Sequence, residues 1–577
     1  MRPQSTPTPV PATRTLPAAR SDAVVLGGGL AGLTLALQLH QARPSTRILV
    51  LERRSFPVPE AAHKVGESTV EIAAEYFTNV LGLKEHILTD QLPKNGLRFF
   101  WKSDPKASME TGLELGWATV LPTPTYQLDR GVFENYLAQQ AVQRGITLVD
   151  GARVTAVTLG EGAADHEVTV GLGAAGTDQT TVRTRWVLDA SGRRAILRHQ
   201  LGLTREVAHD PNAAWFRVDT VVDVETFSDD PGWHARAATG DPRYLSTNHI
   251  MGRGYWVWLI PLSSGSTSIG IVTDPTHHSL DQFATFNKAM DWLDLHEPLV
   301  ANAVRGALAG GASLQDYKLL KHFSHGSKQV FSANRWACTG DAGLFLDPFY
   351  SPGSDFIAIS NTYITELVQR QLDGHGIRIA TKLFETVYQT FFSTGLTIYQ
   401  GQYPLFGNAK VMPVKVLWDI CYYWSLGGPL YFAGKLTSIP TLVAARRTLD
   451  KAVALNATMQ AFFRSWDAVD RGEVRSGFID PSKVETAREL ISHLTEQPPN
   501  GVAKLLRGNL GRLNEIAAEI VGVARTDHPE LARPKPVRAW DGKVVHLGRV
   551  YAAVAAGGMG VDEMDPAPAE IVGRLAA

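Results

Sequence analysis

Cysteine is nearly absent from this sequence, with only Cys338 and Cys421 among 577 residues. Two thiols cannot build a disulfide framework, and such low cysteine usage is typical of a reducing compartment. Positive charge is not in excess either, because 56 Lys and Arg residues stand against 57 Asp and Glu residues. The formal net charge of −1 excludes the basic surface field that collects nucleic acid or anionic membranes.

Long apolar runs are also missing. The most apolar late stretch, residues 417–430, is interrupted by Asp419, Gly427, Gly428 and Pro429, so no membrane span is predicted. Residues 1–20 hold five prolines and three arginines but no acid and no apolar core. This composition predicts a disordered leader and not a signal peptide. We therefore expect a cytoplasmic protein.

Two kinds of catalytic motif are missing as well. No Gly-x-Ser-x-Gly nucleophile elbow occurs, and the histidines at residues 277–278 and 322–325 lack carboxylates at metal-binding spacing, so no metal is expected. The bulk composition is ordinary for a globular protein, with 44% hydrophobic and 20% charged residues. A length of 577 residues predicts two or more domains or one large interleaved unit.

The first informative motif is a glycine-rich turn after a short apolar strand. Residues 23–26 predict the strand, residues 33–40 an apolar helix, and residues 47–51 a second strand. The turn reads G-x-G-x-x-G: its glycines allow a tight turn, close approach of the backbone to a pyrophosphate, and close packing of helix on strand. The predicted dinucleotide contacts are Gly27, Gly29, Leu30, Ala31, Gly32, Glu52 and Arg53.

Two later segments favour FAD over NAD. A strand ends in Asp-Ala-Ser-Gly at residues 189–192, and a Gly-Asp turn follows at residues 340–341, where a carboxylate can bind a ribose or ribityl hydroxyl. Residues 126–143 predict a helix between them and the first motif. The order of these segments resembles the FAD-dependent aromatic hydroxylases. That resemblance implies an α/β fold with a Rossmann-like FAD-binding domain of the glutathione-reductase-like type. It also makes cofactor-binding candidates of Arg130, Asp189, Gly192 and Asp341.

Two further patterns concern the chemistry at the flavin ring. Residues 345–353 have Phe, Pro, Ser and Gly spaced F-x-x-P-x-x-S-x-G, and residues 256–261 read Trp-Val-Trp-Leu-Ile-Pro. Trp256 and Trp258 project from the same face of a strand, where two indoles are most often part of a core. Both patterns together, however, resemble the signatures of flavin-dependent halogenases. The resemblance covers about residues 21–375.

The resemblance implies an interleaved arrangement of domains. After the leader at 1–20 we expect an FAD-binding domain at 21–204 and 326–375, an inserted mixed β-sheet substrate domain at 205–325, and a mainly helical region at 376–577. Aromatic residues crowd the segment 391–432 of that last region. Their helical spacing indicates core packing first and a cover over the substrate pocket second.

The resemblance also implies a two-component halogenase of secondary metabolism. Reduced FAD from a separate flavin reductase, oxygen, and chloride or bromide yield hypohalous acid, which a lysine delivers to an electron-rich aromatic substrate. Lys94 is the predicted carrier, because it precedes Phe99 and Trp101 in the setting where the family has its essential lysine. It acts as an ammonium that donates a hydrogen bond to hypohalous acid or, if burial lowers its pKa from about 10.4, as a free amine that forms a haloamine.

Lys64 is the alternative lysine, in a Val-Gly-Glu segment that lies behind the flavin in the family. We assign to the cofactor side Lys64, Gly66, Glu67 and Ser68. The halide is expected at the backbone amides of Gly353 and Ser354, which open a predicted helix, because Pro352 has no N–H to donate. The residues expected near the flavin are Trp256, Trp258, Pro348, Ser351 and Pro352.

One departure from the family bears on the substrate. Tryptophan halogenases have a glutamate immediately before the serine of the second pattern, whereas this chain has Tyr350, with Asp347 and Asp355 as other acids nearby. Phenol and pyrrole halogenases also lack that glutamate. A phenolic or pyrrolic acceptor, free or tethered to a carrier protein, is therefore favoured over free tryptophan. The alternative function is an FAD-dependent aromatic monooxygenase (hydroxylase) on the same fold, which has no use for Lys94.

Overall fold

The computed structural model describes residues 12–13, 15–16, 20–60, 65–118, 121, 123–172, 178–236, 242–470, 472–495 and 501–539. Most of the predicted leader and the alternative lysine, Lys64, lie outside the described residues. The chain divides into two compact units. Unit 1 comprises Met1–Gln91, Leu128–Ala208 and Ser324–Phe392, and unit 2 comprises Leu92–Gln127, His209–Phe323 and Ser393–Ala577.

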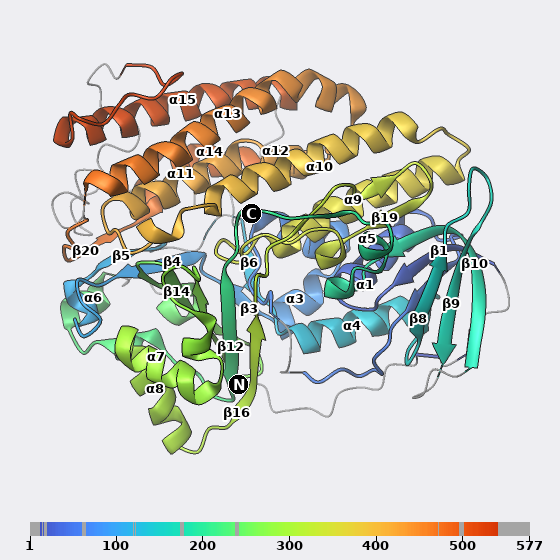
Figure 1. The fold of residues 1–577 in the computed structure, drawn as a ribbon, viewed down its shortest axis with the longest axis horizontal. Coiled ribbons are helices and arrows are strands. Elements are labelled where there is room, and N and C mark those ends of the chain that lie inside the picture. The colour runs from blue at the N-terminus through green and yellow to red at the C-terminus, as the bar shows by residue number, and fades with distance from the viewer. Residues whose placement is uncertain are drawn as a thin grey trace. The chain divides into compact units, whose positions relative to one another are not determined.

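Unit 1 is built on a parallel sheet in the order β19-β10-β1-β2-β7 (Figure 1). Its strands in that order are Trp336–Cys338, Asp178–Asp189, Ser21–Leu26, Ile48–Leu51 and Thr147–Val149. Strands β1 and β2 are buried at every position, as is usual for parallel strands covered on both faces. Helix α1 (Leu30–Ala42) packs against α4 (Arg130–Gln143) and α9 (Gly353–Leu372).

Unit 1 also has an antiparallel extension. Strands β8 (Arg153–Thr158) and β9 (His166–Leu172) pair with each other, and β9 pairs with the first half of β10. The other elements of this unit are α2 (Glu71–Glu75), the π-helical turn η1 (Tyr76–Val80), α3 (Lys84–Asp90), η3 (Gly192–Arg194), α5 (Ile196–Gln200), β11 (Thr204–Arg205), β17 (Gly326–Ser327), β18 (Phe331–Ser332), η7 (Gly340–Ala342) and most of α10 (Arg378–Tyr399).

Unit 2 contains an eight-stranded mixed sheet in the order β16-β12-β15-β14-β13-β4-β5-β20. Strands β4 and β13 are parallel, as are β5 and β20, and the other neighbours are antiparallel. The strands are Leu314–Leu320, Asn212–Val218, Thr267–Thr273, Tyr255–Pro261, Thr247–Gly252, Leu97–Trp101, Leu113–Leu115 and Gly477–Ile479. A separate pair consists of β3 (Leu92–Lys94) and β6 (Thr125–Gln127).

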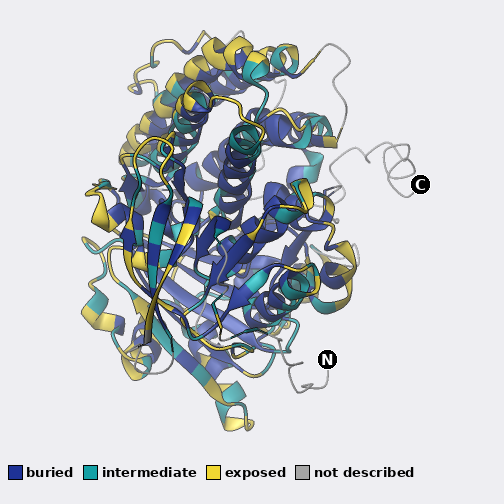
Figure 2. Ribbon diagram, turned by 90° about the vertical axis from the view of Figure 1, so that its right-hand side faces the viewer, coloured by how far each residue is buried: buried dark blue, intermediate teal, exposed yellow. Residues whose placement is uncertain are grey.

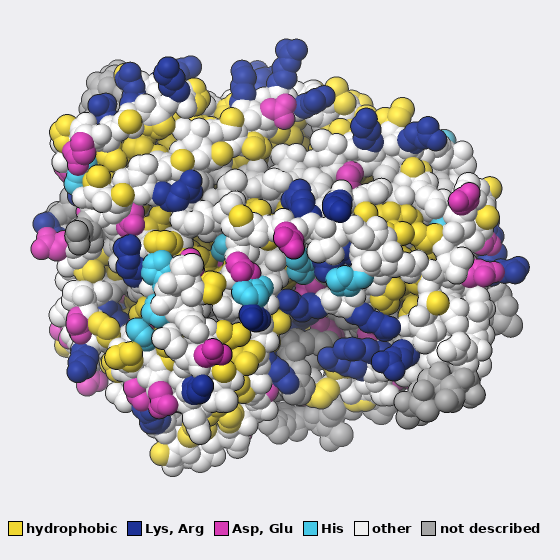
Figure 3. Space-filling model, viewed as in Figure 1, with side chains coloured by type: hydrophobic (Ala, Val, Ile, Leu, Met, Phe, Trp, Pro, Cys, Tyr) yellow, Lys and Arg dark blue, Asp and Glu magenta, His cyan; other side chains and the backbone are white. Residues whose placement is uncertain are grey.

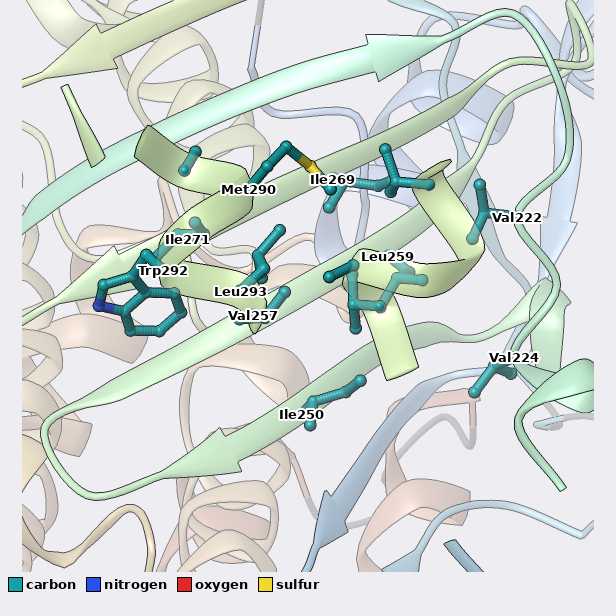
Figure 4. Close-up of a cluster of buried hydrophobic side chains, with 14 of the residues drawn as sticks. Val222, Val224, Ile250, Val257, Leu259, Ile269, Ile271, Met290, Trp292 and Leu293 are labelled. Carbon is teal, nitrogen blue, oxygen red and sulfur yellow. The ribbon is translucent and has the colours of Figure 1, made fainter. Parts of the chain in front are cut away.

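One face of the mixed sheet carries a large hydrophobic core (Figure 4). Its helical side is formed by α7 (Phe286–His296) and α8 (Pro298–Ala309). The strand side chains that take part include Ile250, Val257, Leu259, Ile269 and Ile271. Because side chains alternate along a strand, the residues between them, Trp256 and Trp258 included, belong to the opposite face.

The last part of unit 2 is helical and follows α10. Its helices are α11 (Val411–Ser425), α12 (Gly427–Phe432), α13 (Ile439–Val469), α14 (Glu485–Thr495) and α15 (Val502–Asp527), and α13 packs along α15. Shorter elements of unit 2 are α6 (Pro231–Ala235), η2 (Met109–Thr111), η4 (Val224–Phe227), η5 (Arg243–Leu245), η6 (Leu280–Phe283), η8 (Tyr403–Leu405) and η9 (Pro481–Lys483). Helices α13 and α15 each have a buried and an exposed side, a pattern that Figure 2 shows for the outer helices, whereas α11 is buried at nearly every position. Within the described ranges, no helix combines the length and apolar character needed to cross a membrane.

The predicted fold class is confirmed: an α/β unit on a parallel sheet, a mixed sheet, and a helical C-terminal region. The helix predicted over residues 126–143 begins only at Arg130, because residues 125–127 pair with β3. Residues 205–325 also contain α7 and α8, which the alternating pattern did not indicate. The predicted domain boundaries stay a prediction; residues 92–127 lie in unit 2.

Candidate active site

The glycine-rich turn between β1 and α1 has the close contacts that its pattern predicts. Gly27 has a φ of +113°, and a Cβ there would lie 2.4 Å from the carbonyl oxygen of Ala190. A Cβ on Gly32 would lie 1.9 Å from the Gly27 oxygen, so any side chain would push the helix off the strand. Gly29 differs, because no atom lies within 4 Å of its Cβ position. The turn is therefore closed around Gly27 and Gly32 and open at Gly29.

The open side of this turn is the N-terminus of α1. Gly29 is the N-cap and provides no side-chain cap, so the first amides of the helix, including those of Leu30 and Ala31, have no acceptor on the N-cap residue. The first four N–H groups of a helix have no partner within the helix, and the helix dipole adds a partial positive charge at this end. A phosphate group fits both features.

Glu52 follows β2 and lies beside the turn. Its carboxylate accepts hydrogen bonds from the backbone N–H of Gly28 at 2.7 Å and of Arg54 at 2.8 Å. The carboxylate is partly exposed, and the side chain of Arg53 is exposed. An acid held here by main-chain N–H groups can still accept hydrogen bonds from a ribose, since each oxygen has two acceptor positions.

The second predicted motif, residues 189–192, packs against the first. Asp189 is fully buried, and its carboxylate accepts hydrogen bonds from the N–H of Ser191 at 2.9 Å and of Leu197 at 2.7 Å. Burial raises the pKa of this carboxyl group despite these bonds. Gly192 has a φ of +61° and turns the chain away from the strand. The buried carboxylate of Asp189 thus holds the loop through backbone N–H groups. The main chain of the loop, and not the Asp189 side chain, is therefore the part that a cofactor can contact.

The third motif, residues 340–341, completes the group. Thr339 donates its N–H to the backbone carbonyl oxygen of Asp189 at 2.9 Å. A Cβ on Gly340 would lie 3.0 Å from the Cβ of Ala31. Three segments more than 140 residues apart in the sequence therefore meet around the first turn of α1. We call this arrangement the cofactor cradle, defined by residues 27–32, 189–192 and 340–341.

Arginine side chains provide positive charge at the third motif. Burial raises the pKa of Asp341, and Arg193, Arg130 and Arg198, in that order, oppose the shift. Arg130 donates hydrogen bonds to the oxygens of Val65 at 2.8 Å and Gly66 at 3.2 Å. The segment that contains the predicted residues Gly66, Glu67 and Ser68 is thereby fixed to the start of α4, with Glu67 and Ser68 buried.

The segment predicted to bind halide turns sharply into α9. Ser351 adopts a φ of +58°, which is rare for a residue with a side chain, and its N–H bonds to the Pro348 oxygen at 2.8 Å. Pro352 is the N-cap of α9, Gly353 is exposed, and Ser354 is buried. The first amides of a 20-residue helix therefore follow directly after the pattern.

The two acids near this pattern each accept a backbone N–H. Asp347 is fully buried and accepts from Phe349 at 2.9 Å, and Asp355 accepts from Ala73 in α2 at 2.8 Å. Tyr350 is partly exposed, and its ring lies 4.6 Å from that of Phe349. Both carboxylates thus have a role in fixing the loop and helix that carry the pattern.

Lys94 belongs to unit 2 and is only 3% exposed. It ends β3, and its carbonyl oxygen accepts a hydrogen bond from the hydroxyl of Thr125 in β6 at 3.2 Å. The next residues form a tight turn into β4, since Gly96 has a φ of +61° and a Cβ there would lie 2.4 Å from Trp117. The backbone that carries the Lys94 side chain is therefore held by hydrogen bonds and by close packing against Trp117.

Trp256 and Trp258 lie on the sheet face opposite the hydrophobic core, where aromatic rings are in contact. Phe99 stacks on His249 at 4.6 Å, His249 lies 5.2 Å from Trp256, and the two tryptophan rings are 5.6 Å apart. A segment of the C-terminal region packs on this face. Tyr403 accepts the indole N–H of Trp256 at 3.1 Å, and the Phe406 oxygen accepts that of Trp101 at 2.9 Å.

Sequence reasoning placed Tyr403 only within the aromatic segment 391–432, and it missed a buried charge beneath the Lys94 turn. Arg98 is fully buried and forms an ion pair with Glu114 in β5. The available signal was Arg98 itself, a charged residue within the apolar strand 97–101. Charged residues are almost never fully buried without a partner.

Comparisons with known proteins agree with the geometry of unit 1. Residues 20–277 match the FAD binding domain family. The flavin-dependent halogenase chlA of Dictyostelium discoideum is 26% identical over 487 residues, which cover 80% of this chain and 78% of that protein. The 1H-pyrrole-2-carbonyl-(peptidyl-carrier protein) chlorinase of Pseudomonas fluorescens is 25% identical over 350 residues, covering 58% of this chain and 72% of that protein.

A solved structure extends the likeness to the three-dimensional fold. The crystal structure of halogenase PltM in complex with phloroglucinol and FAD is 16% identical to this chain, with a TM-score of 0.59. The match covers 89% of this chain and 100% of that chain. At this level of identity the likeness shows the fold.

Proposed function

We propose that this chain, an FAD-dependent enzyme similar to the flavin-dependent halogenases, halogenates an electron-rich aromatic compound with the help of a separate flavin reductase. One observation carries the halogenase proposal over a hydroxylase. The lysine predicted to carry halogen is 3% exposed and stands in a turn that hydrogen bonds hold on both sides, so the backbone that carries its amine has a defined position. A hydroxylase has no use for such a lysine.

The cofactor cradle suits FAD. The pyrophosphate would lie at the N-terminus of α1, over Gly29, where a Cβ would meet no protein atom. Glu52 would accept hydrogen bonds from the adenosine ribose, and Asp341 would bind the ribityl chain. Arg130 and the loop at residues 66–68 would lie on the flavin side, while Asp189 supports the loop that ends at Gly192.

The overall reaction balances as FADH2 + O2 + halide + H⁺ giving FAD + hypohalous acid + water. FAD, when bound in its reduced form, supplies the two electrons for this step. Gly353 and Ser354 would hold the halide with their N–H groups at the start of α9, where the helix dipole favours an anion. Pro348, Ser351 and Pro352 shape that turn, and Trp256 and Trp258 stay proposed as residues near the flavin.

Lys94 would then hold the oxidised halogen. As an ammonium it would donate a hydrogen bond to the oxygen of hypohalous acid, which makes the halogen more electrophilic. As a free amine it would form an N–halogen bond and release water. In both cases the aromatic carbon gains halogen and loses a proton, and the second product is water or the regenerated amine.

The acceptor is proposed to be phenolic or pyrrolic, free or tethered to a carrier protein. Tyr350 replaces an acid at the position where tryptophan halogenases have glutamate, and Asp347 and Asp355 each accept a backbone N–H. An electron-rich ring needs less help from a carboxylate. A carrier-bound pyrrole is the group named for the relative from Pseudomonas fluorescens, and phloroglucinol, a phenol, is the compound bound in the PltM complex.

The test is a product assay with FAD, a flavin reductase, NADH, and either chloride or bromide. Phenols, pyrroles and indoles are offered both free and as carrier-bound thioesters, and products are analysed by mass spectrometry. We expect a halogen isotope pattern on a phenolic or pyrrolic acceptor. A product that is heavier by one oxygen atom and contains no halogen would instead support the hydroxylase.

A further inference from the structure

A network of buried charges lies beneath the turn that carries Lys94. Arg98 and Arg243 are fully buried, and both bind the carboxylate of Glu114, which is 1% exposed. Arg243 donates two of these bonds, at 2.9 and 3.1 Å, and also pairs with Glu225 at 2.8 Å. Two guanidinium groups thus meet two carboxylates within unit 2.

The network connects to the Lys94 turn through one hydroxyl group. Arg98 Nε donates to Ser246 Oγ at 3.3 Å, and Ser246 Oγ donates to the carbonyl oxygen of Asn95 at 2.8 Å. Asn95 follows Lys94 directly, so this chain of bonds ends one residue from the proposed halogen carrier. Ser246 is fully buried, and no water is needed to complete the connection.

The other side of the turn is fixed by the same arginine. Arg98 Nη2 donates to the carbonyl oxygen of Trp117 at 2.6 Å, and the ring of Trp117 lies over Gly96. A Cβ on Gly116 would lie 2.8 Å from the guanidinium carbon of Arg98, so only glycine lets Arg98 reach this far. Arg98 therefore holds both the residue after Lys94 and the ring that covers the turn.

The segment that carries Ser246 is itself held in place by the network. The N–H of Asn95 bonds to the Leu245 oxygen at 3.2 Å, and the N–H of Thr247 bonds to the Gly96 oxygen at 3.1 Å. Arg243 begins the same segment and fixes it to Glu114 and Glu225. The turn thus docks on residues 243–247 through main-chain bonds, and the ion network sets where that segment lies.

Stability alone is a weak explanation for this network. Desolvating several charges costs as much as their attraction returns, and well-packed apolar residues often stabilise a core equally well. What a network of directional, charge-assisted bonds adds is a single fixed geometry. A carrier of hypohalous acid needs that property, since a small misplacement of a reacting group lowers the rate strongly.

We propose that Arg98 is a positioning residue for Lys94 and acts through Ser246, with Glu114 and Arg243 as its anchors. The proposal rests on the proposed function, because it assigns the purpose of the network to halogen transfer. Arg98 does not touch the substrate in this account. It fixes the backbone from which the lysine extends, so that oxidised halogen reaches the acceptor and is not released.

The test uses the full-length enzyme with FAD bound and the variant Ser246→Ala, which removes the hydroxyl and keeps every charge. We expect the turnover number for halogenation to fall by about tenfold to 100-fold while the KM for the acceptor is unchanged. The amount of halogenated product per NADH oxidised should fall in parallel, and free hypohalous acid captured by a soluble trap should rise. Hydrogen exchange should accelerate at the amides of Asn95 and Gly96.

Three further variants separate positioning from general damage. Ser327→Ala removes another fully buried serine hydroxyl, which donates to the Gln329 oxygen at 2.7 Å in unit 1, and it should leave coupling unchanged. Ser246→Thr keeps the hydroxyl and should restore most of the coupling. Arg98→Lys keeps the charge but loses the forked bonds to Ser246 and Trp117, and it should uncouple the enzyme further. If Arg98→Lys fails to fold, the serine variants still test whether Ser246 links the network to the Lys94 turn.

Two results would overturn the inference. One is a Ser246→Ala enzyme whose product yield per NADH equals that of the wild type and of Ser327→Ala. The other is unchanged hydrogen exchange at Asn95 and Gly96, which would mean that Ser246 does not hold the turn. If the wild type forms no halogenated product with any acceptor, the proposed function fails, and the exchange experiment still tests the mechanical link.

Discussion

In unit 1 the proposed cofactor contacts are mostly main-chain groups, whereas in unit 2 the proposed halogen carrier is one side chain held by distant residues. The cradle depends on Gly27 and Gly32, which have no room for a Cβ, and on amides at the start of α1, and the proposed halide site depends on amides at the start of α9. The Lys94 turn depends on Arg98, Ser246 and Trp117. We therefore expect side-chain atoms added to the cradle glycines to weaken cofactor binding in unit 1. Side-chain atoms removed around Lys94 should instead weaken halogen transfer in unit 2.

The largest effect is expected from Lys94→Ala. If unit 2 contributes its chemistry through a single amine, this variant should lose halogenated product by at least about 1000-fold, as enzymes do when a group that reacts covalently is removed. FAD binding should remain, because Lys94 is not one of the residues of the cofactor cradle. Product is measured by mass spectrometry and FAD affinity by quenching of flavin fluorescence.

Lys288→Ala serves as the control, since this exposed lysine donates to the backbone carbonyl oxygen of Asp281 at 3.1 Å and has no part in the proposed chemistry. It should halogenate like the wild type. A Lys94→Ala enzyme that retains halogenation would remove the contrast between the units, because the amine would then not be the reactive group of unit 2.

Gly29→Ala should have the next largest effect. It tests whether main-chain groups of unit 1 bind the cofactor. Its φ of −83° suits alanine, and no protein atom lies within 4 Å of the new methyl group, so the fold should be retained. The methyl would instead occupy the space proposed for the pyrophosphate. Loss of one charge-assisted bond of about 1.5–3 kcal/mol would raise the FAD dissociation constant by about ten- to 100-fold.

Gly306→Ala is the matched control, because this glycine in α8 also has open space at its Cβ position. There the substitution should leave FAD affinity unchanged and stabilise the helix by about 0.5–1 kcal/mol. Equal FAD affinity in Gly29→Ala and the wild type would show that the cofactor does not approach the turn at Gly29.

The same contrast explains how much could be predicted from the sequence. The three segments of the cradle were predictable because each is local: the glycine pattern, the strand ending at Asp189, and the Gly-Asp turn each have their own signature. The support of Lys94 was not, because Glu114 and Ser246 come from segments whose order along the chain says nothing about contact. The helices α7 and α8 were missed for a related reason, since the strands around them dominate the alternation pattern.

Tyr403→Phe tests whether the aromatic face of unit 2 depends on single polar atoms. The variant leaves the buried indole N–H of Trp256 without the hydroxyl that accepts it at 3.1 Å. We expect a loss of about 1–3 kcal/mol of stability, the usual cost of a buried donor that loses its acceptor. The thermal unfolding midpoint, followed by tryptophan fluorescence, should fall.

Tyr363→Phe provides the opposite case in unit 1. Tyr363 is fully buried, and its hydroxyl has no hydrogen-bond partner among the described residues. Removing that hydroxyl should leave the unfolding midpoint unchanged or raise it. If both phenylalanine variants lose the same stability, the hydrogen bond between Tyr403 and Trp256 contributes nothing beyond the volume of the ring.

The smallest effect is expected from pH and concerns a histidine cluster near β14 and α7, where histidine side chains gather on the visible face (Figure 3). Burial, and then the neighbouring His278, lowers the pKa of His296 to about 4. The pKa of His278 is also lowered by burial. The pKa of both imidazoles is thus lower in the folded protein than in the unfolded chain, which takes up protons near pH 6.5. Stability is thus fully present above pH 6.5 and is lost as the pH falls toward 4.

Buried acids act in the opposite direction. Burial raises the pKa of Glu297 in unit 2 and of Asp189 and Asp341 in unit 1, so the folded state binds protons before the unfolded chain does and gains stability as the pH falls. His296→Phe isolates the histidine contribution, because the ring that packs 4.4 Å from Trp292 is replaced by another ring. Between pH 7 and 5 the unfolding midpoint of the wild type should fall more than that of His296→Phe, and an exposed control, His375→Phe, should follow the wild type. Parallel curves for all three proteins would mean that His296 does not remain neutral, and acid sensitivity would then not distinguish unit 2 from unit 1.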